Sequence, residues 1–352
     1  MKKLIAFLLS AIMVLSLCAC ATDGPAADET TVAETEAETS PFADHKVEYP
    51  TTVIDHLGRE VTFDKPAEKL VSGYYISTSI LIGLGLEDKL VGIEAKADTR
   101  NIYKIAAEEI ISLPSVGTAK NFDLETCAAL SPDLVIIPVK LSSVIEQLEA
   151  LGIKVLAINP ESTDSLIQTI IMLSRATGTL ARGVRMVDDY QRGIASISKR
   201  LAKVEESPKV YLAGNSSFLS TAGSAMYQNA LIENAGCENV AKELTDTYWA
   251  EVSYEQILTW NPEYIIIASN ADYTVESVLE DKNLSECDAV KNGNVYQIPS
   301  TYEDWDSPVP SSFLGSIWLA ATIHKDNYSM VEFNKYMKDF YDIHYEFEAE
   351  NF

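Results

Sequence analysis

Two widely separated stretches of this chain follow one pattern, and the repeat constrains the fold more than any other feature. Residues 123–133 lead into the apolar run 134–137, and residues 253–263 lead into the run 264–267. Each stretch predicts a short helix stopped by a polar residue and a proline, because proline cannot continue a helix and pushes the residue before it toward extended geometry. The apolar run that follows is typical of a strand buried on both faces of a parallel sheet. The repeat therefore predicts two similar α/β lobes with a ligand cleft between them.

The remaining sequence extends this pattern into two doubly wound α/β lobes joined by one long helix. Strands are predicted at 51–55, 59–63, 69–72, 89–93, 154–158, 209–213 and 294–298. Residues 163–203 carry apolar side chains at helical spacing, with Gly178 as the break between two helices. We expect a first lobe at 49–178, a connecting helix at 179–206 and a second lobe at 207–352. Helices at about 311–324 and 330–344 are expected to close the chain.

The N-terminus has the pattern of an export signal rather than of folded structure. Lys2 and Lys3 precede an apolar stretch, and the stretch ends in Leu17-Cys18-Ala19-Cys20. This ending resembles a bacterial lipobox, in which Cys20 becomes the lipidated first residue; an ordinary secretory signal with two incidental cysteines is the alternative. Residues 21–48 are acidic and poor in large apolar side chains, which predicts a flexible tether. We expect a monomer outside the cytoplasm, held at the cell membrane by its lipid anchor alone.

Composition excludes several classes of function. The net charge of −25 argues against nucleic acid or anionic lipid as a partner. The four histidines form no cluster, and the cysteines at 127, 237 and 287 have no metal-ligand spacing, so neither a metal site nor a resident cofactor is expected. A disulfide between Cys237 and Cys287 stays open. The chain has no dinucleotide fingerprint, nucleophile elbow or P-loop, so an enzyme such as a metallochelatase is disfavoured.

Several further segments, in this order, resemble one family of transport proteins. They are residues 53–61, 83–93, 116–117, 130–135, 151–155 and 290–296. Together they resemble the class III substrate-binding lipoproteins of ABC importers for ferric siderophores, haem and cobalamin. The resemblance implies two lobes joined by a single helix, modest closure on the ligand, and delivery to an ABC permease with its ATPase.

The resemblance also implies a docking role for two glutamates. In this family one glutamate on each lobe forms salt bridges with arginines of the permease, and the matching positions are Glu125 and Glu255. Both lie at the same place in the repeat. Solvated surface glutamates are the alternative interpretation. A surface sensor or adhesin of the same fold that feeds no transporter also stays open.

Ligand contacts are expected from loops at the carboxyl ends of the strands. These candidates are Tyr74, Tyr75, Lys96, Arg100, Lys120, Asn121, Lys140, Asn215, Ser216, Tyr248, Trp249, Asn270, Tyr273 and Trp305. The two tryptophans are favoured because a large aromatic side chain in a polar loop usually covers something. The acids Glu303, Asp304 and Asp306 are interpreted as a solvated loop around Trp305.

The expected cargo is a whole metal chelate, with a ferric siderophore preferred to a corrinoid or haem. Because every arginine lies at or before Arg200, an anionic chelate would have to rely on cations of the first lobe.

Overall fold

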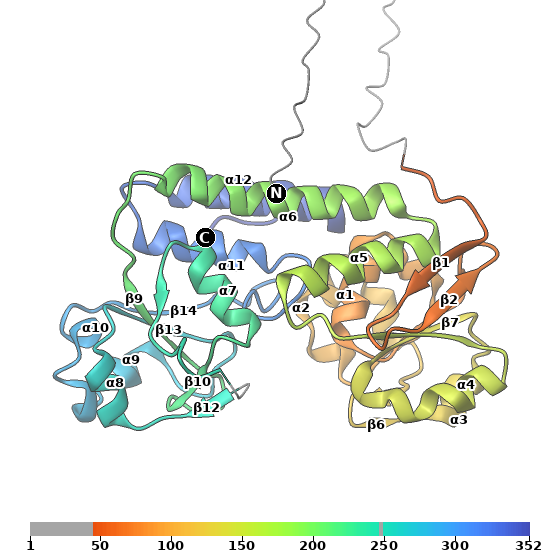
Figure 1. Cartoon of the computed structure of the whole chain (residues 1–352), viewed down its shortest axis with the longest axis horizontal. Helices are drawn as coiled ribbons and strands as arrows, with labels where there is room; N and C mark the ends of the chain where they lie inside the picture. Colours follow the sequence, from red (N-terminus) through yellow and green to blue (C-terminus); the bar gives the residue numbers. More distant parts are fainter. Residues whose placement is uncertain (1–44, 246–248) are drawn as a thin grey trace, which may run out of the picture. The chain divides into compact units, whose positions relative to one another are not determined.

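The computed structural model describes residues 45–245 and 249–352, which lie within a single compact unit. The first lobe is built on a parallel sheet in the order β4-β3-β7-β8, shown at the right of Figure 1. Its strands are β3 (Leu70–Ser72), β4 (Leu90–Gly92), β7 (Leu134–Pro138) and β8 (Lys154–Ile158). Its helices are α1 (Tyr75–Gly83), α2 (Asn101–Ala106), α3 (Leu124–Ala129), α4 (Ile145–Ala150) and α5 (Thr163–Thr177). The predicted hairpin is confirmed by β1 (Thr51–Ile54) and β2 (Glu60–Phe63), and a second hairpin joins β5 (Gly117–Thr118) to β6 (Asn121–Phe122).

The second lobe is built on a mixed sheet in the order β12-β10-β9-β13-β14, with β11 also paired to β9. Its strands are β9 (Lys209–Ala213), β10 (Ser220–Ala222), β11 (Glu238–Asn239), β12 (Trp249–Glu251), β13 (Tyr264–Ile267) and β14 (Val295–Gln297). Its helices are α7 (Tyr227–Asn234), α8 (Tyr254–Trp260), α9 (Val275–Leu279), α10 (Asp288–Lys291), α11 (Phe313–Ile323) and α12 (Met330–Tyr345). Strands β9, β13 and β14 are parallel, whereas β10 pairs antiparallel with both β9 and β12.

Both apolar runs of the repeat are buried on two faces, which confirms the doubly wound α/β architecture. In β7, Leu134 and Ile136 join one apolar cluster, while Val135 and Ile137 join another on the opposite face. In β13, Ile266 belongs to the same cluster as Leu134 and Ile136, while Ile265 and Ile267 pack on the opposite face. Side chains alternate across a strand, so a sheet covered on both faces needs an unbroken apolar run. The shared cluster continues from one lobe into the other.

The acid that precedes each of these strands has an equivalent role in the two lobes. Asp133 accepts hydrogen bonds from the backbone N–H groups of Glu68 and Lys69 at the start of β3. Glu263 accepts one from Lys209 N–H at the start of β9. Each carboxylate thus fixes the neighbouring strand that pairs with its own. The repeat therefore extends beyond the helix and strand to the hydrogen bonds that set the sheet order.

One local expectation about the repeat is wrong. The residues before the two prolines, Ser131 and Asn261, are not extended but lie in the left-handed region, at φ 49° and 44°. A left-handed residue is a common way to end a helix, because its N–H can bond to a late carbonyl. Asn261 N–H donates to Ile257 O over 2.9 Å. The way in which each helix ends therefore sets the backbone conformation of the residue before the proline.

A long helix, α6 (Leu180–Leu201), connects the two series of strands and runs along the top of both sheets in Figure 1. Gly178 adopts φ 78° and separates it from α5. Helix α12 packs on α6, on α11 and on α1 of the first lobe. Its Tyr345 hydroxyl lies 3.0 Å from Ser79 Oγ on α1. The lobes are therefore tied by the C-terminal helix as well as by the connector.

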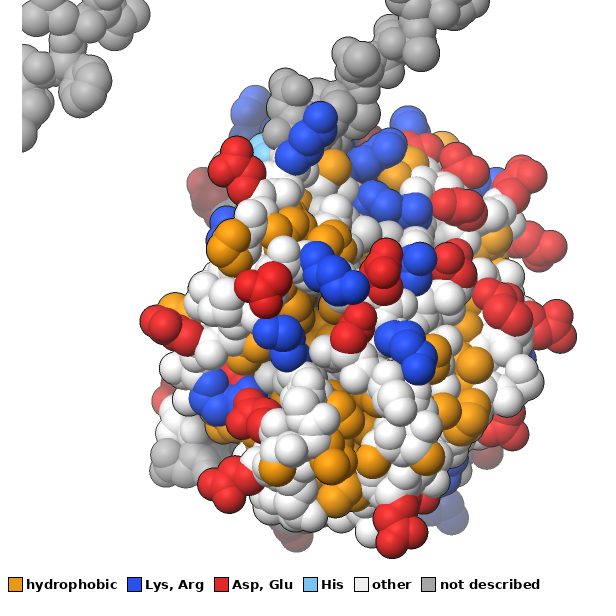
Figure 2. Space-filling view, turned by 90° about the vertical axis from the view of Figure 1, so that its right-hand side faces the viewer, with side chains coloured by type: hydrophobic (Ala, Val, Ile, Leu, Met, Phe, Trp, Pro, Cys, Tyr) orange, Lys and Arg blue, Asp and Glu red, His pale blue; other side chains and the backbone are white. Residues whose placement is uncertain are grey.

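The face of the molecule drawn in Figure 2 carries charges of both signs. Figure 2 shows acidic and basic side chains interspersed on the face that it presents. No helix within the described residues is long and apolar enough to span a membrane. Cys20 and its lipobox lie outside the described residues, as does most of the predicted tether.

Candidate functional site in the cleft between the lobes

The carboxyl ends of the central strands of both lobes meet around two cavities. The first, here called the Glu161 cavity, has a volume of about 240 Å³. It is lined by Tyr74 and Glu161 from the first lobe, and by Asn215, Trp249 and Asp306 from the second. The second, here called the Arg100 cavity, has about 380 Å³ and is lined by residues that include Tyr75, Arg100, Asn270 and Asp304. Tyr75, Asn270 and Asp304 line both.

Arg100 lies in the middle of the interface between the lobes. Its guanidinium carbon lies 4.2 Å from the centre of the Tyr75 ring, and its Nη1 lies 3.5 Å from Asp304 Oδ2. Asp304 also accepts a hydrogen bond from Asn270 Nδ2 over 2.6 Å. The cation is therefore already stacked on an aromatic ring and paired with a carboxylate. An anionic ligand would have to compete with Asp304 for it.

A buried carboxyl group lies at the edge of the Arg100 cavity. Glu303 is 6% exposed and contacts the hydroxyl groups of Ser79, on α1 of the first lobe, and Ser311, in the second. Burial raises the pKa of Glu303 to about 7, although hydrogen bonds from the two serines lower it. Burial likewise raises the pKa of Asp306 to about 6, against a hydrogen bond from Ser269 N–H.

Two expectations about this loop need correction. Trp305 is 1% exposed and packs against Phe333, and its indole N–H donates to Tyr341 Oη over 2.9 Å. It is a core residue rather than a cover for the ligand. Glu303 and Asp306 are each 6% exposed, so the loop is not solvated as interpreted. The reason is that α12 and the residues after it cover this loop.

The structure brings together only some of the predicted ligand contacts. Those that line a cavity are Tyr74, Tyr75, Arg100, Asn215, Trp249 and Asn270. Those that line neither cavity are Lys96, Lys120, Asn121, Lys140, Ser216, Tyr273 and Trp305. Tyr273 instead donates to Gly214 O over 2.6 Å and packs on Phe218. Tyr248 lies outside the described residues.

Sequence reasoning missed several residues that line the Glu161 cavity. Glu161 lies three residues after the end of strand β8, so the rule that selected Tyr74 after β3 could have found it. Gln228 lies on α7, and nothing in its sequence context separates it from other helix residues. Within the described residues, no three His, Cys, Asp or Glu side chains are grouped to hold a metal ion. Cys237 and Cys287 are both free thiols.

The two proposed docking glutamates occupy equivalent positions. Glu125 lies in the first turn of α3, which Asp123 caps, and Glu255 lies in the first turn of α8, which Ser253 caps. Both side chains are exposed. Helices α3 and α8 lie at the lower edge of Figure 1, away from α6. The glutamates therefore present one negative charge from each lobe at this edge.

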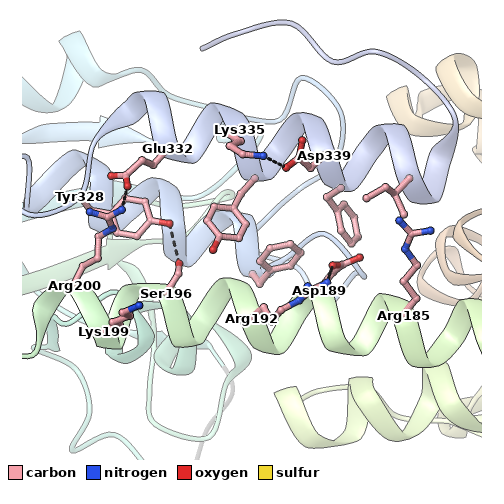
Figure 3. A pocket seen from close by; sticks show the side chains of 14 residues that line it. Arg185, Asp189, Arg192, Ser196, Lys199, Arg200, Tyr328, Glu332, Lys335 and Asp339 are labelled. Carbon is pink, nitrogen blue, oxygen red and sulfur yellow. Dashed lines mark hydrogen bonds and ion pairs between the residues drawn. The ribbon is translucent and has the colours of Figure 1, made fainter. Parts of the chain in front are cut away.

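A larger groove of about 960 Å³ lies away from the cleft, between α6 and α12 (Figure 3). Phe313 and Phe340 line it together with charged side chains from both helices. An ion pair between Arg200 and Glu332 links the two helices at one end, and His344 Nε2 lies 2.8 Å from Asp189 Oδ2 further along. Arg192 pairs with Asp188 and Asp189, and Lys335 with Asp339. Most of these charged side chains pair with one another, so they are less available to a ligand than the carboxylates that line the cleft.

Comparisons with known proteins show which family and which solved structures this chain resembles. A family described as periplasmic binding protein matches residues 70–302. The molybdate-binding protein MolA of Haemophilus influenzae is 26% identical over 317 residues, which cover 83% of this chain and 90% of MolA. The solved structure of MolA, described as the cognate periplasmic binding protein of an ABC transporter, matches with a TM-score of 0.75 at 24% identity, covering 86% of this chain and all of MolA.

Two further proteins are similar along most of the chain. The vitamin B12-binding protein of Vibrio parahaemolyticus is 25% identical over 253 residues, which cover 70% of this chain and 86% of that protein. A periplasmic solute binding protein from Veillonella parvula has a solved structure that matches with a TM-score of 0.75 at 25% identity, covering 85% of this chain and 94% of that one.

Proposed function

The chain belongs to the periplasmic binding protein family, and from this membership we propose that it captures a ferric siderophore without net negative charge and delivers it to an ABC permease. Family members are substrate-binding proteins of transport systems, and this chain is a solute-binding protein of an ABC importer. The identity of the cargo is the more specific part of the proposal. It is supported by the charges of the side chains that line the cleft.

Carboxyl groups outnumber cations in the cleft, and this observation carries the proposal. The two cavities are lined by Glu161, Glu303, Asp304 and Asp306, against the single guanidinium of Arg100. At pH 7 burial leaves Glu303 only partly ionised, but the other three carboxylates still outnumber the one cation, so a ligand with net negative charge is disfavoured. Molybdate, a ferric tricatecholate and haem with its two propionates are all anions. In a ferric trihydroxamate, three singly charged ligands cancel the charge of the metal.

A corrinoid is the second candidate, because it also lacks the strong negative charge that the cleft disfavours. Relatives include a vitamin B12-binding protein. Tyr74, Tyr75 and Trp249 would supply aromatic surface for the flat face of either chelate. The two candidates differ in shape rather than in charge. A direct binding comparison therefore separates them.

Delivery to the permease is proposed to depend on Glu125 and Glu255. Their equivalent exposed positions on α3 and α8 would let one carboxylate from each lobe pair with arginines of the permease. Exposed ion pairs are worth about 0–1 kcal/mol each, so two pairs fix the register more than they add affinity. Lipidation at Cys20 would hold the protein near its permease, with the acidic residues 21–48 as the tether.

The cargo is tested by thermal unfolding of the purified full chain with ferrichrome, a ferric tricatecholate, cyanocobalamin, haem and molybdate. A ligand at 100 times its Kd stabilises the folded state by about 2.7 kcal/mol. We expect the largest increase in Tm with ferrichrome, and with cyanocobalamin if the corrinoid alternative holds. A larger increase with molybdate or the tricatecholate would refute the charge argument.

Docking is tested separately by uptake of the identified ligand into cells that carry Glu125→Ala together with Glu255→Ala. We expect uptake to fall while the affinity of the purified protein for its ligand stays unchanged. The matched control is Glu146→Ala with Glu276→Ala, because these exposed glutamates occupy the first turns of α4 and α9. Normal uptake in the first double variant, or an equal loss in the second, would rule out specific docking through Glu125 and Glu255.

A further inference from the structure

The described residues that line the Glu161 cavity supply several hydrogen-bond acceptors and no cation. Glu161, Asp304 and Asp306 line it, and none of its lining residues is Lys, Arg or His. Two of these carboxylates have partners in the protein. Asp306 accepts from Ser269 N–H over 2.9 Å, and Asp304 pairs with Arg100 and Asn270. They therefore have structural roles that explain their presence without a ligand.

Glu161 has no such explanation. Its half-buried side chain makes no hydrogen bond or ion pair with any residue of 45–245 or 249–352. Burial raises the pKa of Glu161, while the charge of Lys140 lowers it. A carboxylate that is partly removed from water without a partner is unfavourable for folding. Such a group is typical of a binding site whose partner comes from outside the chain.

Gln228, which lines the same cavity from the opposite lobe, carries a second acceptor without a partner. Gln228 is 7% exposed, and its amide nitrogen donates to Asp306 O over 2.8 Å. This bond fixes the orientation of the amide, because only the nitrogen can donate to a carbonyl oxygen. The other atom of the amide, Oε1, is buried and has no hydrogen-bond partner. An unsatisfied buried acceptor costs about 1–3 kcal/mol, so a ligand that donates a hydrogen bond here gains affinity.

The aromatic lining fits the same kind of group. Tyr74 and Trp249 line the cavity together with Glu161. Aromatic faces attract cations, and ammonium groups are commonly held between aromatic rings and carboxylates. The neighbouring Arg100, stacked on Tyr75 and paired with Asp304, already shows this arrangement within the cleft. Tyr74 and Glu161 would provide it for a cation that the ligand brings.

We propose that the Glu161 cavity binds a protonated amine, so that the cargo is a metal chelate with a pendant ammonium group. The ammonium group pairs with Glu161, donates toward Gln228 from the other lobe and rests against Tyr74 and Trp249. A neutral donor such as an amide N–H could satisfy Gln228, but it would leave the charge of Glu161 without a partner. Because Glu161 and Gln228 belong to different lobes, the same group also draws the lobes together.

This inference rests on the proposed function, and the test separates the two. The probes are ferrioxamine B, a ferric trihydroxamate that ends in a protonated amine, and its N-acetylated form, which keeps the chelate but loses the charge. Binding of each to the purified full chain is measured at pH 7 by quenching of tryptophan fluorescence. We expect a Kd at least about tenfold lower for ferrioxamine B than for the acetylated form.

Variants then test whether the preference for ferrioxamine B over its acetylated form depends on Glu161. Glu161→Gln is expected to raise the Kd of ferrioxamine B until it equals that of the acetylated form, whose own Kd stays within about twofold. Glu146→Gln, an exposed position on α4, is the matched control and should keep the full preference. Equal wild-type Kd values for the two forms would overturn the ammonium site while leaving the chelate function intact. Failure of both forms to bind would overturn the ferric trihydroxamate function and the inference with it.

Discussion

Replacement of Glu303 by glutamine should remove a large part of the pH dependence of folding stability. The carboxyl group is 6% exposed at the contact between the lobes, and burial raises its pKa from 4.5 to about 7. The folded protein therefore holds this proton over a range in which the unfolded chain has lost it. A raised acid pKa means that stability falls as pH rises from about 4.5 through about 7. Arg100, Asp304, Tyr341 and Tyr345 are the charged and titratable groups that influence it.

The size of the effect follows from the two pKa values. A shift of one unit corresponds to 1.36 kcal/mol, so between pH 5 and pH 8 the ionisation of Glu303 should lower the unfolding free energy by about 2–3 kcal/mol. Glutamine keeps the shape and can hydrogen-bond to Ser79 and Ser311, but it cannot ionise. The stability of Glu303→Gln relative to wild type should therefore rise by about this amount over the same interval.

Urea denaturation of both proteins at pH 5 and pH 8 measures this difference. Comparison with wild type at each pH cancels the contributions of Asp306 and Glu94, whose pKa values burial also raises. Glu108→Gln is the control, since this glutamate is exposed. If the difference between Glu303→Gln and wild type stays constant within about 0.5 kcal/mol across the two pH values, the buried carboxyl does not carry the predicted cost.

Two further changes test other parts of the structure. Gly193→Ala should lower the unfolding free energy by about 1–3 kcal/mol, because the added Cβ would lie 2.4 Å from the Phe313 ring at the contact of α6 with α11. Urea denaturation measures this loss. Ser198→Ala, at an exposed position on the same helix, should change the unfolding free energy little, so equal losses in the two variants would contradict the packing argument. Cys20→Ala should move the protein from the membrane fraction to the soluble fraction with ligand affinity unchanged, as seen by blotting of separated fractions; a variant that stays in the membrane fraction would refute lipidation at this cysteine.

The fold could be predicted from the sequence because its signals are local. The 134–137 and 264–267 runs became β7 and β13, and the break at Gly178 separates α5 from α6. Each signal depends on the spacing of apolar residues within one element or on one backbone conformation. The rule that ligands meet the carboxyl ends of strands also placed Tyr74 and Asn215 at a cavity.

The loop with Glu303, Trp305 and Asp306 could not be predicted in the same way, because its environment comes from distant parts of the chain. Trp305 is buried by Phe333 and Tyr341 of α12, and Glu303 is held by Ser79 of α1. In the sequence alone, a run of acids around a tryptophan has the composition of an exposed loop. Its burial is decided only once α12 has packed against α1. The candidate site was therefore found in outline, while its carboxyl groups were misjudged.

The return of α12 to the first lobe joins segments that are far apart in the sequence. Ser79 on α1 and its partner Tyr345 are 266 residues apart in the sequence. This contact between the lobes therefore depends on a helix that follows both sheets along the chain. A chain cut short before α12 would present the apolar surface of α1 and α11 to proteases and chaperones. Contacts between residues so distant in the sequence form slowly, so we expect the two sheets to fold before α12 joins the lobes.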